Sequence, residues 1–176
     1  VHEFSHALAG KLQGDDTADR EGRLTLNPLA HIDWFGFFLL MIAGFGWARP
    51  TPFNPYNLRY PRLGPILIAL AGPFANIIMV VVIGTALGII VRATDLPPTN
   101  LLIQFFLLLI KVNVLLAVFN FIPIPPLDGS RVLYIFLGSR TELISILERY
   151  GMWFLFILVF LGGDTLSALF KFFDNL

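Results

Sequence analysis

The chain has 176 residues, of which 56% are hydrophobic and only 14% are charged. Soluble domains carry about 25% charged residues, so this composition indicates a membrane protein. Twelve basic and twelve acidic residues give no net charge, and we therefore expect no attraction to nucleic acid. Because the sequence has no cysteine, disulfides and thiolate metal sites are excluded, and a bound metal must use nitrogen and oxygen ligands.

The first third of the chain alternates between apolar and polar segments. Residues 1–12 are expected to form the end of a helix. Because the chain has no initiator methionine, we interpret 1–176 as one membrane domain that is truncated at its N-terminus. Residues 34–47 are apolar but too few for a membrane span, which suits an interfacial or re-entrant segment. Residues 48–64 are rich in proline and arginine and are expected to form an extended loop.

Two longer apolar segments, 65–91 and 101–122, are each long enough to cross a bilayer, although Lys111 interrupts the second. A third apolar segment, 152–173, is a further candidate span and is broken by Gly-Gly-Asp at 162–164. The expected fold class is therefore an all-α polytopic membrane protein. It would be a bundle of transmembrane helices with a short re-entrant or interfacial segment and an extended proline-rich loop.

The basic residues predict the orientation of the chain in the bilayer. If 34–47 does not cross, nine basic residues fall on one side, and only Arg92 and Lys171 fall on the other. Positively charged residues concentrate on the cytoplasmic side of membrane proteins, so the side with nine is predicted to be cytoplasmic. The nine are Lys11, Arg20, Arg23, Arg49, Arg59, Arg62, Arg131, Arg140 and Arg149.

The strongest chemical signal is the run His-Glu-Phe-Ser-His at residues 2–6. Two imidazoles four residues apart share one face of a helix, where His2 and His6 can bind one zinc ion. Glu3 between them is placed to act as the general base of a metalloprotease. The alternative is a structural histidine pair at a helix end, but two histidines and a glutamate in lipid are costly unless they are paired or bind a metal.

A catalytic zinc ion usually takes three protein ligands, so a third must come from elsewhere in the chain. Asp128 follows the segment 101–122 at its predicted cytoplasmic end, on the same side as the histidine pair. It also lies in Pro-Pro-Leu-Asp-Gly, which favours a turn by itself, so the residues alone leave its role open. The candidates for the third ligand are His31, Asp33, Asp95, Asp128 and Asp164.

These motifs resemble those of the site-2 protease family of intramembrane zinc metalloproteases, in its compact bacterial form. Residues 2–6 match the zinc helix of that family, and the run Asn-Phe-Ile-Pro-Ile-Pro-Pro-Leu-Asp-Gly at 120–129 matches its second signature. Gly-Pro-Phe-Ala-Asn at 72–76 matches a further motif, and residues 26–33 and 46–50 also resemble segments of these proteases.

The resemblance implies one zinc ion per chain, held by His2, His6 and Asp128, with Glu3 as the catalytic base and His31 in a structural role. It implies peptide hydrolysis in transmembrane protein substrates. Together with the distribution of basic residues, this predicts a multi-pass protein of the cell membrane whose active site lies nearer the cytoplasmic side. The alternative is a membrane transporter, or another non-proteolytic membrane protein, with a structural metal site. That reading gives no reason for a glutamate beside the first ligand.

Polar residues in the apolar segments are candidates for binding substrate. Asn76 and Asn120 can donate hydrogen bonds to a substrate backbone or an oxyanion, or else to a neighbouring helix. For Asn113, which would lie on the same helical face as Asn120, we favour the packing role.

The segment 47–55 is a candidate edge strand. Two prolines two residues apart would remove the donors of one edge and leave the N–H groups of Arg49, Thr51 and Phe53 on the other. Such an edge could receive an extended substrate by strand addition. The alternative is a proline-rich loop.

Overall fold

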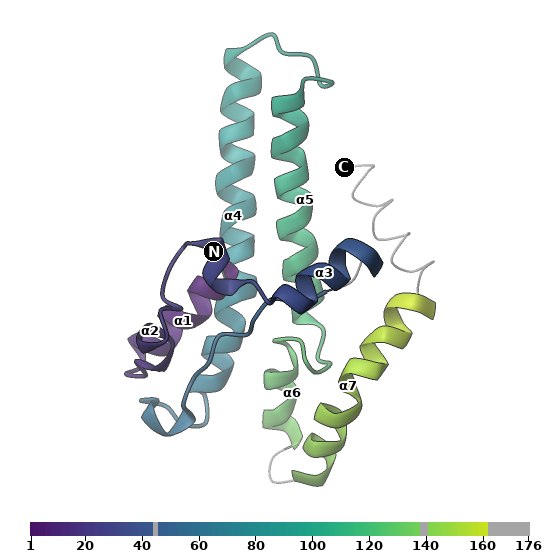
Figure 1. Cartoon of the computed structure of the whole chain (residues 1–176). Helices are drawn as coiled ribbons and strands as arrows, with labels where there is room; N and C mark the ends of the chain where they lie inside the picture. Colours follow the sequence, from purple (N-terminus) through teal and green to yellow (C-terminus); the bar gives the residue numbers. More distant parts are fainter. Residues whose placement is uncertain (44–45, 138–140, 162–176) are drawn as a thin grey trace. The chain divides into compact units, whose positions relative to one another are not determined.

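The computed structural model describes residues 1–43, 46–137 and 141–161, and all regular elements within these ranges are helices (Figure 1). The all-helical part of the predicted fold class is therefore confirmed. The chain divides into two compact units, residues 1–75 and 76–176. The elements are α1 His2–Leu12, α2 Thr17–Arg20, η1 Pro28–His31, α3 Trp34–Ala43, η2 Pro55–Asn57, α4 Gly64–Ala93, α5 Leu101–Phe121, α6 Ser130–Leu137 and α7 Thr141–Leu161.

In the first unit, α1 packs against α2 and against the first turns of α4 (Figure 1). Gly14 follows the end of α1 with a φ of 96°, a conformation that glycine adopts without a steric cost and that reverses the chain toward α2. Small residues lie between these helices: Ala7 and Ala18 are almost fully buried, and a Cβ on Gly10 would lie 3.7 Å from the Ile68 side chain.

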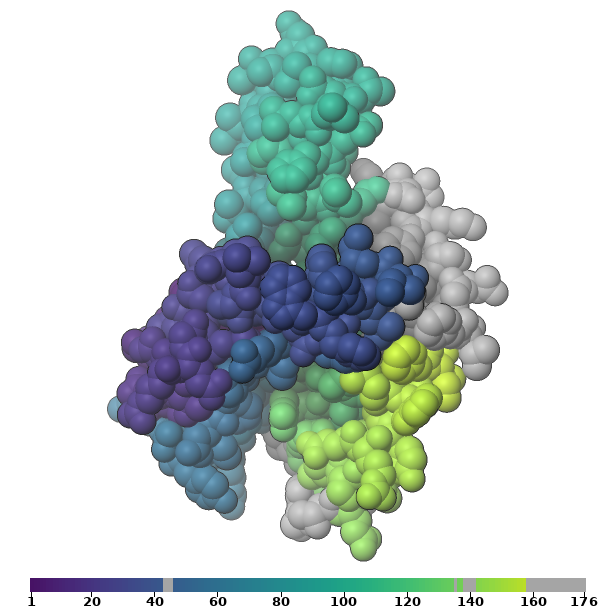
Figure 2. Space-filling view, in the orientation of Figure 1, coloured from purple at the N-terminus to yellow at the C-terminus, as the bar shows by residue number. Residues whose placement is uncertain are grey.

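Helix α3 has ten residues, so it is about 15 Å long and too short to cross a hydrocarbon core of about 30 Å. Its aromatic side chains lie on the surface that Figure 2 shows in dark blue, with Trp34 60% and Phe35 71% exposed. This agrees with the length argument from the sequence, and the interfacial or re-entrant placement stays a prediction. The start of α3 lies against the backbone of residue 47, because a Cβ on Gly36 would be only 2.3 Å from the Trp47 carbonyl oxygen.

In the second unit, α5 follows the remainder of α4 after a short connection. Both helices are long and apolar enough to cross a membrane, by length and composition, and they occupy the segments predicted as 65–91 and 101–122. They approach each other where a Cβ on Gly84 would lie 4.0 Å from Ile110 Cδ1. The side chain of Asn100 caps α5 by accepting a hydrogen bond from the Leu102 N–H.

The stretch 123–149 contains α6 and the first turns of α7, and these two helices are in contact (Figure 1). The third candidate span, 152–173, therefore begins inside a helix that starts at Thr141. Its remainder from residue 162, with the Gly-Gly-Asp break and Asp164, lies outside the described residues.

Candidate metal centre

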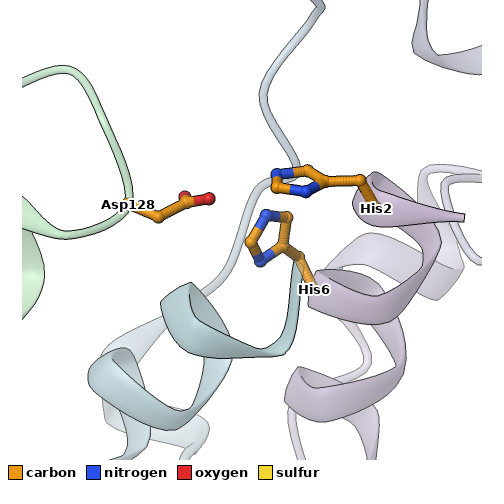
Figure 3. Close-up of side chains that lie close together, drawn as sticks. All are labelled: His2, His6 and Asp128. Carbon is orange, nitrogen blue, oxygen red and sulfur yellow. The ribbon is translucent and has the colours of Figure 1, made fainter. Parts of the chain in front are cut away.

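His2 and His6 lie one turn apart on the same face of α1 (Figure 3). Their ring centroids are 4.6 Å apart with the planes nearly perpendicular, and their ligand nitrogens lie within 4.8 Å of each other. This is the juxtaposition that the spacing in the sequence predicts for two zinc ligands.

The orientation of His6 is fixed by a backbone carbonyl of α4. Its Nδ1 lies 2.7 Å from the Ile68 carbonyl oxygen, and the side chain is only 6% exposed. Because a carbonyl can only accept, Nδ1 is the donor in this hydrogen bond, and in a neutral imidazole Nε2 is then the nitrogen that can bind a metal. A hydrogen bond from the ring nitrogen that does not bind the metal is the usual way in which proteins orient a metal-binding histidine.

Gly72 gives the two imidazoles their space. A Cβ at this position would lie 2.4 Å from His6 Nε2 and 2.6 Å from His2 Cε1, so only glycine fits without moving the rings. Pro73 follows inside α4 and lacks the N–H that would bond to the Ala69 carbonyl. The motif at 72–76, which the sequence links only to a family resemblance, thus has a physical role beside the histidines.

Glu3 faces the proline-rich segment of the same unit. Its Oε2 accepts a hydrogen bond of 2.8 Å from the Thr51 hydroxyl, and its main-chain oxygen lies 3.2 Å from the same hydroxyl. The sequence singled out Thr51 for its N–H group, whereas the structure brings its side chain to the predicted general base.

The residues before Thr51 are held by Arg23, which is only 2% exposed. Its guanidinium donates to the carbonyl oxygens of Ala30, Arg49 and Pro50. Burial lowers the pKa of Arg23, the charge of Arg49 lowers it further, and Glu3 opposes the shift. In the sequence, the positive charge of Arg23 is its only distinguishing feature.

The backbone of Arg49 corrects the edge-strand hypothesis. Its N–H donates a hydrogen bond of 2.9 Å to the His31 carbonyl, so it is not a free donor for a substrate strand. Within the described residues, 46–54 form no strand, and the chain turns into the short helix η2 at Pro55. Backbone donors of folded proteins are normally paired, and here the partner is the carbonyl of His31, from an earlier part of the first unit.

The residues after Thr51 are held by Asp15, which is 1% exposed. Its carboxylate accepts hydrogen bonds from the Thr17 hydroxyl at 2.6 Å, the Asn54 N–H at 2.7 Å and the Asn57 side-chain amide at 3.1 Å. Burial raises the pKa of Asp15, but these hydrogen bonds together outweigh burial, and the pKa lies below its ordinary value.

Two of the alternative third ligands are used in local structure. His31 Nε2 lies 2.9 Å from the Thr25 carbonyl, and Asp33 accepts the Gly36 N–H at the start of α3. Asp95 lies exposed in the connection between α4 and α5, and Asp164 lies outside the described residues.

In the second unit, Asp128 lies in the turn between α5 and α6, and Figure 3 also draws its side chain. The Gly129 N–H donates to the Asn120 carbonyl at 2.7 Å, and a Cβ on Gly129 would lie 2.5 Å from the Phe121 carbonyl oxygen. Helix α7 closes on the same turn, since a Cβ on Gly151 would lie 2.3 Å from the Pro125 carbonyl oxygen. The backbone around Asp128 is therefore tightly packed.

The asparagines of α5 bond to their own helix. Asn120 Nδ2 donates to the Leu116 carbonyl and Asn113 Nδ2 to the Leu109 carbonyl, at 2.9 and 2.8 Å. Asn76 in α4 is 2% exposed. An amide nitrogen has two donors, so the substrate-binding roles of Asn76 and Asn120 stay predictions.

Comparison with known proteins identifies one family model and two relatives that this chain resembles. Residues 87–161 match the model of the family described as Peptidase family M50. The chain is 44% identical over 137 residues to YwhC of Bacillus subtilis, named a candidate zinc metalloprotease, and the match covers 76% of this chain and 62% of that protein. It is 31% identical over 176 residues to Rip2 of Mycolicibacterium smegmatis, named in the same way, covering 97% and 65% respectively. No solved structure matches the chain.

The matched family is one of peptidases, and both relatives are named as zinc metalloproteases. The resemblance to the site-2 protease family that the motifs predicted is confirmed by the family match and by these two relatives. The chain spans slightly less than two thirds of the length of the relatives it matches.

Proposed function

We propose that this chain carries the active site of a zinc-dependent intramembrane metalloprotease that hydrolyses peptide bonds of transmembrane protein substrates. The observation that carries the proposal is the arrangement around His6. The Ile68 carbonyl fixes the proton on Nδ1, and the lack of a Cβ at Gly72 lets both imidazoles lie close against α4. A purely structural histidine pair needs neither feature, whereas both suit a metal.

His2 and His6 would hold the zinc ion together with Asp128, which the tightly packed turn after α5 presents. Two nitrogens and one carboxylate oxygen form a typical catalytic zinc set, and they leave one position open. When bound, zinc supplies Lewis-acid chemistry that polarises a scissile carbonyl and makes water more acidic.

Glu3 is the general base in this proposal. Its carboxylate takes a proton from the attacking water and later delivers that proton to the leaving nitrogen. Glu3 directly follows His2 in α1, and its Oε2 already has a hydrogen-bond partner in Thr51. Its role requires no metal contact.

The membrane placement follows from α4 and α5, which are long and apolar enough to span. We extend this to a multi-pass protein of the cell membrane with the active site nearer the cytoplasmic side. The support is the concentration of basic residues at the predicted cytoplasmic end of these helices.

The test compares the membrane-protein fragments released by cells that express the full-length protein or its Glu3→Gln variant. We expect specific fragments of transmembrane proteins that disappear in the variant, while the purified variant keeps its zinc. A chelator should abolish cleavage by the purified wild type. Identical fragments from both proteins would overturn the proposal and favour a transporter or another non-proteolytic membrane protein.

A further inference from the structure

The Thr51 hydroxyl makes a contact that nothing in the proposed mechanism uses. It lies 2.8 Å from Glu3 Oε2 and 3.2 Å from the Glu3 main-chain oxygen. Thr51 is separated from Glu3 by 48 positions in the sequence, so this contact depends on the fold of the first unit and not on local chain geometry.

The segment that carries Thr51 is fixed on both sides. Before it, Arg23 binds the carbonyl oxygens of Arg49 and Pro50, and the Arg49 N–H binds His31. After it, the Asn54 N–H donates to the buried Asp15. A residue whose backbone is held on both sides has little freedom to move away from the carboxylate, which is the requirement for a group that positions another.

We propose that Thr51 is a positioning residue for the general base Glu3. The hydroxyl engages Oε2 and so leaves Oε1 as the atom that takes the proton from water. This inference rests on the proposed function. In that hydrolysis the water oxygen bonds to the carbonyl carbon, and one water proton moves to Oε1. The proton then passes to the leaving nitrogen as the C–N bond breaks.

The single proton of the Thr51 hydroxyl supports this positioning role. A threonine hydroxyl has one proton to donate, and at 2.8 Å its carboxylate contact is the shorter of the two. Oε2 therefore has a fixed donor both before and after Oε1 gains its proton. The carboxyl group keeps its orientation through the cycle, so the base does not reorganise during the reaction.

The test uses Thr51→Val, which keeps the shape of the side chain and removes the hydroxyl, and Thr51→Ser, which keeps the hydroxyl. A hydrogen bond to a charged acceptor corresponds to roughly a ten- to hundredfold effect on rate. With a transmembrane peptide that the wild type cleaves, we expect Thr51→Val to lower kcat by that factor. KM and zinc content should stay unchanged, and Thr51→Ser should restore most of the rate.

A Thr51→Val enzyme with wild-type kcat would overturn the inference, and so would equal losses in the valine and serine variants, a change in KM alone, or a loss of zinc. Glu3→Gln keeps the two proposals separate. If Glu3→Gln cleaves normally, the proposed function is wrong. If Glu3→Gln is inactive while Thr51→Val is normal, only the role of Thr51 is wrong. The double variant should be no slower than Glu3→Gln alone, because the hydroxyl acts through the carboxylate.

Discussion

Substituting Gly72 by alanine tests whether the histidine pair depends on the close approach of α4. The added Cβ would lie 2.4 Å from His6 Nε2 and 2.6 Å from His2 Cε1. Non-bonded heavy atoms rest at about 3.5–4.0 Å, so each ring must move by about 1 Å or more. Either the rings rotate or α1 moves away from α4, and both changes disturb the 2.7 Å contact between His6 Nδ1 and the Ile68 carbonyl.

Two effects set the expected magnitude for Gly72→Ala. Losing a hydrogen bond that orients a metal ligand typically costs ten- to a hundredfold in metal affinity. A misplacement of about 1 Å at a reacting centre costs on the order of a hundredfold in rate. In an ordinary helix interior the same substitution would stabilise the protein by roughly 0.5–1 kcal/mol. A weaker metal site without a less stable helix is therefore the specific expectation.

The assay is competition for zinc between the purified variant and a chelator, together with cleavage of a transmembrane peptide. Gly88→Ala, in the same helix α4, is the matched control, because no atom lies within 4 Å of its added Cβ. Thermal unfolding of the metal-free proteins separates a local effect from loss of the fold. If Gly72→Ala binds zinc and cleaves as well as Gly88→Ala, the reasoning about the histidine space is refuted.

Three further predictions concern other residues. Asp128→Ala should lose zinc, as measured by metal analysis, and full occupancy would contradict its role as third ligand. Cysteines at Tyr56 and Thr99 should be labelled from opposite sides of the membrane, and labelling from one side would show that α4 does not cross. Asp15→Asn should reduce the free energy of unfolding near neutral pH by about 1–3 kcal/mol, which a lower melting temperature would show. Since the pKa of Asp15 is lowered in the folded state, its contribution is complete above the ordinary pKa and is lost as pH falls through the lowered one. The variant and the wild type should therefore converge in acid, and a difference that stays constant as the pH falls below the ordinary pKa would refute this.

The long helices were predictable because apolar composition and length constrain them strongly. Segments predicted at 65–91 and 101–122 became α4 Gly64–Ala93 and α5 Leu101–Phe121. A backbone in lipid must satisfy its own hydrogen bonds, which leaves an apolar segment of this length little choice but a helix. The pairing of His2 and His6 was predictable for a similar reason, because four residues make about one helical turn.

The contacts that organise the site were not predictable from the sequence. The roles of Arg23, Asp15 and Gly72 depend on contacts between segments far apart in the chain. The pattern of polar and apolar residues along the sequence does not indicate such contacts. The edge-strand hypothesis failed at Arg49 because a proline pattern shows which donors are missing but not where the remaining donors bond.

The composition of the proline-rich segment explains why a buried arginine holds it. Prolines at 50, 52 and 55 have no N–H, so this backbone offers mainly carbonyl oxygens. A guanidinium carries five donors and no acceptor, which makes Arg23 a suitable partner for several carbonyls at once. Because the guanidinium and the Asp15 carboxylate fix the backbone on both sides, the Thr51 hydroxyl is not needed to hold its own segment. It is therefore available to Glu3, and the same prolines that remove a regular strand here make that contact possible.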